Sequence, residues 1–176
     1  MQKLSMDQLN RVDIESFKEL EKTPITIVLD NVRSMHNVGS AFRTADGFAI
    51  EQILLCGITA TPPHREIEKT ALGATQSVDW THYKETTEAL QHLKEQGYKI
   101  FAIEQAENST SLEQFEISTN DKYAFVFGNE VHGVDEEVMQ IVDGCIEIPQ
   151  FGTKHSFNVS VTIGIVLWDI LKKIKF

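Results

Sequence analysis

Short apolar runs alternate with amphipathic stretches along most of this chain, and this alternation restricts its fold more than any other feature. Several apolar runs lack the strict two-residue alternation of a sheet with one face in water. The sequence therefore predicts an α/β fold, with a mostly parallel sheet covered by helices on both faces. Strands are predicted at 25–31, 52–57, 77–83, 98–105, 123–129 and 144–149, and helices at 37–48, 86–97, 135–142 and 157–174, with a loop and a short helix at 60–73.

The first part of the chain has the pattern of a surface helix. Within residues 5–22, apolar side chains fall on roughly one helical stripe and charged residues lie elsewhere. The stripe consists of Leu9, Val12, Phe17 and Leu20. Pro24 is expected to end this helix. We therefore predict an amphipathic helical extension over residues 1–24, followed by a single catalytic domain over residues 25–176.

The charge balance limits the classes of partner. With 16 basic and 26 acidic residues, the 176-residue chain has a formal net charge of −10, which argues against a general polyanion binder. Composition alone favours an acidic surface with scattered basic residues. It leaves room for local basic groups, and the sequence has three: Arg33, His36 and Arg43; His64, Arg65 and Lys69; Lys154 and His155.

Other features point to a cytoplasmic protein that binds no metal. The N-terminal stretch has no apolar core of a secretory signal, and the apolar stretch 159–174 is too short to span a bilayer and carries Asp169. Cys56 and Cys145 each lie in an apolar run, so we expect reduced core thiols. The six histidines have no recognisable metal-ligand spacing, and no metal site is predicted.

A first motif, N-x-G-x-x-x-R, runs from Asn37 to Arg43. We expect Asn37 to cap a helix and Arg43 to lie back over Gly39, where the missing side chain leaves space. A guanidinium beside free N–H groups of a helix start would suit a phosphate or an alkoxide. Taken alone, the motif favours an ordinary capped helix with a solvated arginine over such a site.

A second motif, F-G-N-E-x-x-G, ends the apolar run that begins at Tyr123. Ligands of open α/β sheets gather at the carboxyl ends of strands, which is where Gly128, Asn129 and Glu130 fall. Gly128 and Gly133 would allow a tight turn close to a ligand. The alternative for this motif alone is a strand-to-helix turn with a solvated Glu130.

A third motif, I-P-x-x-G-x-x-x-S-x-N-V-S-V, covers residues 148–161. We expect Ser156 to cap the last helix and Asn158 to lie in its first turn, although a plain loop and helix start would read the same way. The helix that follows is apolar nearly all the way round. It must therefore be buried on more than one face, which in a small domain favours a subunit interface.

Together and in this order, the three motifs resemble those of the SpoU (TrmH-like) RNA 2′-O-methyltransferases of the SPOUT superfamily, over about residues 25–172. The resemblance implies an α/β fold with a C-terminal deep trefoil knot, an exception among proteins. It also implies S-adenosylmethionine as cofactor and a homodimer. The chain looks like a minimal, single-domain member of this family.

The resemblance also implies roles for individual residues. The catalytic set would be Arg43, Asn37, Glu130, Ser156 and Asn158. The cofactor would lie against Gly128, Ile148, Phe157 and the strand end at Ala102–Glu104. The family usually has leucine where this chain has Phe157, and the position stays apolar. Candidates for RNA contact are Arg33, His36, Arg65 and Lys154.

These residue types suit methyl transfer to a ribose 2′-OH. The hydroxyl must lose a proton and lie in line with the methyl group, so the protein has to position it and stabilise the alkoxide. Arg43 is often cast as the general base in this family, but a guanidinium is hard to deprotonate, and we favour electrostatic stabilisation. The expected substrate is structured RNA, with tRNA favoured over rRNA. The rival hypothesis is a catalytically silent knotted RNA-binding or assembly factor, which the net charge of −10 supports best.

Overall fold

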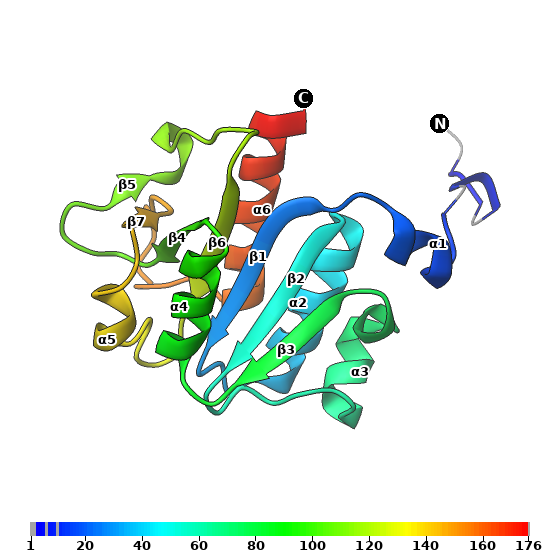
Figure 1. The fold of residues 1–176 in the computed structure, drawn as a ribbon, viewed down its shortest axis with the longest axis horizontal. Coiled ribbons are helices and arrows are strands. Elements are labelled where there is room, and N and C mark those ends of the chain that lie inside the picture. The colour runs from blue at the N-terminus through cyan, green and yellow to red at the C-terminus, as the bar shows by residue number, and fades with distance from the viewer. Residues whose placement is uncertain (1–2, 6, 10, 176) are drawn as a thin grey trace.

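The computed structural model describes residues 3–5, 7–9 and 11–175 of the chain, and its centre is one parallel sheet (Figure 1). The seven strands lie in the order β3-β2-β1-β6-β4-β7-β5, and every pair of neighbours is parallel. The strands are β1 (Thr23–Asp30), β2 (Ile50–Cys56), β3 (Asp79–Tyr83), β4 (Tyr98–Ile103), β5 (Thr110–Ser111), β6 (Lys122–Phe127) and β7 (Gly144–Glu147). The two-residue strand β5 was not predicted from the sequence.

Helices cover both faces of the sheet. In Figure 1, α4 (Thr86–Glu95) and α5 (Glu136–Met139) lie in front, and α2 (Met35–Gly47) and α6 (Val159–Lys175) lie behind. The short helix α3 (Arg65–Ala71) packs beside α2, on the same side as α6. Each face of the sheet belongs to its own apolar cluster, so the central strands are buried on both sides. The predicted α/β architecture is confirmed, and double burial explains why the apolar runs do not alternate.

The chain reverses its direction of travel across the sheet next to the central strand. From β1 it moves outward through β2 and β3, and it then crosses back to build the other half around β6 and β4. In open α/β sheets a crevice forms at the carboxyl ends of strands beside such a reversal. The strand order therefore places a candidate ligand site near the ends of β1, β6 and β4.

The N-terminal extension differs from the predicted long helix. Its described part contains a 3₁₀ turn (Asp7–Leu9) and a six-residue helix α1 (Ile14–Glu19), none of whose residues is buried. Pro24 lies inside β1, because the strand already begins at Thr23. A short amphipathic helix has little stability without a surface to pack on, and α1 is visibly separate from the sheet (Figure 1).

Two predicted helix caps were wrong by two or three residues. Ser34, not Asn37, caps α2, and its hydroxyl accepts from the backbone N–H of Asn37 at 3.3 Å. Asn158, not Ser156, caps α6, and its Oδ1 accepts from the backbone N–H of Ser160 at 2.9 Å. Asn37 therefore lies inside the first turn of α2, and Asn158 lies just before α6.

Three further expectations concern the remainder of the chain. Within the described residues, no helix is long and apolar enough to cross a membrane. Cys56 is buried, Cys145 is half-buried, and neither forms a disulfide. No group of three or more potential metal ligands was found among the described histidines, cysteines and acids.

Candidate active site

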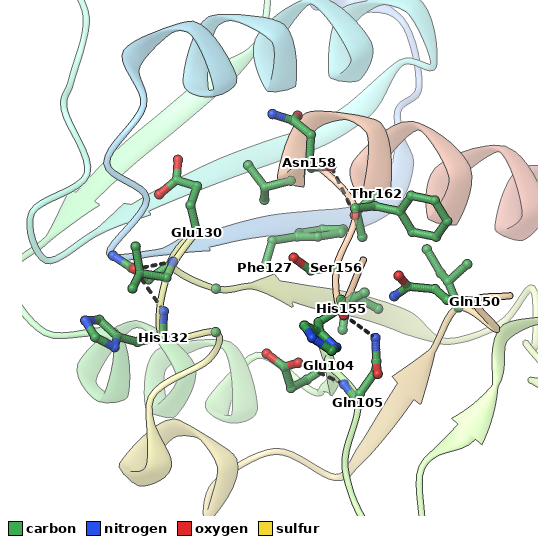
Figure 2. A pocket seen from close by; sticks show the side chains of 18 residues that line it. Glu104, Gln105, Phe127, Glu130, His132, Gln150, His155, Ser156, Asn158 and Thr162 are labelled. Atoms are coloured by element: carbon green, nitrogen blue, oxygen red, sulfur yellow. Dashed lines mark hydrogen bonds between the residues drawn. The ribbon is translucent and has the colours of Figure 1, made fainter. Parts of the chain in front are cut away.

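A cavity of about 530 Å³ lies where β4, β6 and β7 end. Ile103, Phe127 and Ile148 line it from these three strand ends, and residues 155–159 line it from the approach to α6. Figure 2 shows Asn158 on one side of the cavity and Glu104 and Gln105 on the other. Its walls combine apolar side chains with convergent polar groups, as small-molecule sites usually do.

The second motif forms a tight turn at the cavity wall. Asn129 and Gly133 pair with each other through two backbone hydrogen bonds of 2.8 and 2.9 Å. A Cβ atom at Gly128 would lie 2.1 Å from the carbonyl carbon of Gly133, and Gly133 has a φ of +72°. Gly128 is therefore required by a close backbone approach, and Gly133 by a left-handed conformation.

Glu130 projects from this turn and binds the backbone just before α2. Its carboxylate accepts from the backbone N–H groups of Arg33 and Ser34, each at 2.9 Å, and from Nδ2 of Asn37 at 3.0 Å. Burial raises the pKa of Glu130, but the two backbone hydrogen bonds favour the charged form, and the net pKa lies below its ordinary value of 4.5. Glu130 is thus a charged anchor for the first motif.

Asn37 connects this anchor to the third motif. Its Oδ1 accepts from Nδ2 of Asn158 at 3.2 Å, and Oδ1 of Asn158 in turn accepts from the hydroxyl of Ser160 at 2.6 Å. Asn37 is buried, so its two amide hydrogen bonds fix its orientation. One continuous polar chain therefore joins all three motifs beside the cavity.

The anchoring role of Glu130 predicts a pH-dependent contribution to stability. A carboxylate with a lowered folded-state pKa stabilises the fold above its unfolded pKa, and this contribution disappears as the pH falls through the folded-state value. We expect the difference in melting temperature between the parent and Glu130→Gln to be largest above pH 5 and to shrink below about pH 4.5. Glu136→Gln, at an exposed position, is the control. A constant difference between pH 7 and pH 3 would contradict this role.

Gly39 has a different purpose from the one expected. A Cβ atom at this position would lie 2.1 Å from Oγ1 of Thr70 and 2.2 Å from the carbonyl oxygen of Ile67. The glycine lets α2 and α3 approach closely, so the space over it is filled by α3 and is not available to Arg43. Arg43 itself is exposed on α2 and does not line the cavity.

Three of the four expected cofactor residues line the cavity: Gly128, Ile148 and Phe157. Ala102 is buried in the core on the other face of the sheet, and its neighbour Ile103 lines the cavity in its place. Ser156 also lines the cavity. Gln105 could not be found from the sequence. Its Nε2 donates to the carbonyl of His155 at 2.9 Å and connects the third motif to the end of β4.

The expected RNA contacts lie on the surface in two places. Arg33 and His36 flank the start of α2, and Arg65 begins the adjacent helix α3. His36 contacts Glu66 through Nε2 at 2.9 Å. Lys154 lies apart from them, in the exposed third-motif loop next to the cavity residue His155.

Comparison with known proteins identifies the family. The model of the SpoU rRNA methylase family matches residues 24–168, which is most of the chain. The chain belongs to this family. The match includes all three motifs and every strand that surrounds the cavity.

Similar proteins from this family include RNA-modifying enzymes. The 23S rRNA (guanosine-2′-O-)-methyltransferase RlmB of Neisseria meningitidis is 30% identical over 159 residues, or 90% of this chain, which spans 62% of that enzyme. The tRNA (guanosine(18)-2′-O)-methyltransferase of Borreliella burgdorferi is 29% identical over 92% of this chain and 72% of its own length. An AdoMet-bound rRNA methyltransferase from Sinorhizobium meliloti shares the fold, with a TM-score of 0.81 and 22% identity over 91% of this chain and 61% of that one.

Proposed function

We propose that this protein transfers a methyl group from S-adenosylmethionine to a ribose 2′-OH of structured RNA. The observation that carries the proposal is the polar chain Glu130–Asn37–Asn158, which holds the three family motifs together at the mouth of the cavity. Relatives named for tRNA and for 23S rRNA support RNA as the substrate. We favour tRNA, because a compact enzyme can read a folded RNA through both subunits of a dimer.

The cavity suits the proposed cofactor. Its volume of about 530 Å³ falls in the range of small-molecule sites, about 300–1,000 Å³. Ile103, Phe127 and Ile148 offer an apolar bed for an adenine ring, and the polar groups of Glu104 and the Gly128–Asn129 turn face the same space. When bound, the cofactor supplies a methyl group on a sulfonium, which needs no further activation.

The protein groups then have to position and stabilise the RNA. Glu130 fixes the backbone that begins α2, and Asn37 and Asn158 present oriented amides beside the cavity. Arg43 is exposed on the same helix, where it is available to an RNA lying across α2. We propose that its guanidinium stabilises the developing 2′-alkoxide and a neighbouring phosphate. Ser156, at the cavity wall, completes the proposed catalytic set.

We further propose that the C-terminal segment forms the trefoil knot and that the protein is cytoplasmic. We also propose that it forms a homodimer through α6. Two apolar side chains at the start of α6 are exposed to solvent. Val161, in the first turn of α6, is 50% exposed, and Phe157, just before the helix, is 43% exposed. Apolar surface of this kind near a site is typical of a subunit interface.

A charge at Val161 should therefore weaken the dimer. Val161→Glu would place a carboxylate in the apolar contact, and we expect the dissociation constant of the dimer to rise at least tenfold, or about 1.4 kcal/mol. Sedimentation velocity at several concentrations measures the effect. Lys84→Glu, at an exposed position before α4 and away from α6, is the control. A parent protein that is monomeric at micromolar concentration would refute the dimer.

The function itself is tested by methyl transfer. S-adenosylmethionine with a labelled methyl group is incubated with the protein and with RNA from a cell that lacks this protein. The ribose that carries the label is then mapped. The proposal expects stoichiometric labelling of one RNA position at a 2′ oxygen. Tight RNA binding without any transfer would instead favour the silent binding factor.

A further inference from the structure

Glu104 is a charged side chain built into the cavity wall at the end of β4. Its Oε1 accepts from the backbone N–H of Gln105 at 2.9 Å, and its Oε2 accepts from the backbone N–H of Val134 at 3.2 Å. Its own backbone N–H donates to the carbonyl of Ile146 at 3.1 Å, and its carbonyl accepts from Sγ of Cys145 at 3.2 Å. These contacts come from three segments and fix both the backbone and the carboxylate.

The second motif is shaped around this carboxylate. A Cβ atom at Gly133 would lie 2.2 Å from Oε2 of Glu104, so any other residue there would displace the acid. The motif glycine therefore serves two needs, the turn and the space for Glu104. An acid that the fold accommodates in this way differs from a solvated surface carboxylate.

The carboxylate has hydrogen-bonding capacity left for a ligand. A carboxylate has about four acceptor positions, and the two backbone N–H groups use one on each oxygen. Figure 2 shows the side chain of Glu104 at the wall of the cavity, across from Asn158. Two adjacent acceptors match two adjacent hydroxyl donors, and an acid near a strand end binds ribose hydroxyls in dinucleotide-binding folds.

We infer that Glu104 binds the ribose 2′- and 3′-hydroxyls of the cofactor. The inference rests on the proposed function, because it takes the cavity as the S-adenosylmethionine site. It makes Glu104 a specificity residue that distinguishes a ribonucleoside from a nucleoside lacking these hydroxyls. The competing contact for a carboxylate on this cofactor is the ammonium of its methionine part.

Calorimetry with two probes separates these contacts. S-adenosylhomocysteine has both the ribose and the ammonium, whereas 5′-methylthioadenosine keeps the ribose and lacks the ammonium. For Glu104→Gln we expect both probes to bind at least tenfold more weakly, because a hydrogen bond to a charged group is replaced by a neutral one. Glu107→Gln, at an exposed position three residues further along, should bind both probes like the parent.

Each other outcome decides against the inference. Weaker binding of S-adenosylhomocysteine alone would assign Glu104 to the ammonium, and unchanged binding of both probes would remove it from the site. If Glu104→Gln does not fold, the parent is titrated with 3′-deoxy-5′-methylthioadenosine. We expect this probe to bind at least tenfold more weakly than 5′-methylthioadenosine, because it lacks the 3′-hydroxyl. Equal affinity of the two probes would overturn the inference.

The same titrations keep this inference apart from the proposed function. A parent that binds neither probe would refute the cofactor cavity, and the role of Glu104 with it. A parent that binds both probes but transfers no methyl group to RNA would refute only the enzymatic proposal. In that case the affinities of the parent and of Glu104→Gln for the two probes would still decide whether Glu104 binds the ribose.

Discussion

Replacement of Arg43 by alanine should reduce single-turnover methyl transfer at least about a hundredfold, the usual loss for one preorganised charged donor. The affinity for S-adenosylhomocysteine should stay within twofold of the parent, because Arg43 does not line the cavity. RNA affinity should fall modestly, since one phosphate contact among several is lost. The prediction is checked by measuring the transfer rate, cofactor affinity and RNA affinity on the same preparation.

Two further variants sharpen this test. Arg43→Lys should recover little of the rate, because an ammonium cannot reproduce the planar fork of a guanidinium. Arg11→Ala removes another exposed arginine, in the N-terminal extension, and should leave the rate unchanged. If Arg43→Ala transferred methyl groups at nearly the parent rate, Arg43 would no longer belong to the catalytic set. Tight RNA binding with no turnover in the parent would favour the silent binding factor.

Replacement of Gly128 by alanine should abolish measurable cofactor binding at micromolar concentrations. The added Cβ would lie 2.1 Å from the carbonyl carbon of Gly133 and 2.3 Å from the nitrogen of Val134, and both are backbone atoms. The turn would have to open, which displaces Asn129 and the wall of the cavity. Overpacking of this kind costs about 1–3 kcal/mol. At about 2–4 °C per kcal/mol, we expect the melting temperature to fall by several degrees.

The third motif provides the matched control for this variant. A Cβ atom at Gly152 would meet nothing within 4 Å, and no left-handed φ is required there. Gly152→Ala should therefore melt like the parent and bind S-adenosylhomocysteine with similar affinity. Calorimetry and thermal melting compare the two alanine variants directly. Equal behaviour of both variants would show that the turn at Gly128 tolerates a side chain.

The sheet could be predicted because its strands are apolar on both faces. Runs such as 25–31 and 123–129 are short, apolar without alternation, and rich in β-branched or aromatic residues, a combination that favours a strand covered on both faces. Their order in the sheet could not be predicted, since β1 pairs with β6 across most of the chain. The N-terminal helix was overestimated for a related reason. Its apolar stripe is real, but the sequence cannot show that it lacks a surface of the same chain to pack on.

The site was predictable in composition and less so in detail. Serine and asparagine are both good helix caps, so spacing alone could not decide between Ser34 and Asn37. That distinction matters, because Asn37 is thereby free to join Glu130 to Asn158. Glu104 could be noticed only as the end of a strand. Its importance depends on the hydrogen bond from Val134 and on the space left at Gly133, which are 30 and 29 positions away in the sequence.

The polar chain beside the cavity also sets the order in which a newly made protein can become active. Asn37 is 93 positions from Glu130 and 121 positions from Asn158. At about 5–20 residues per second, the ribosome needs on the order of ten seconds to supply these later partners. Until then the first motif has emerged without its anchor, and β1 lacks one of its two neighbours. The hydrogen bonds that join the three motifs therefore cannot be complete in a growing chain before residues 130 and 158 have been made.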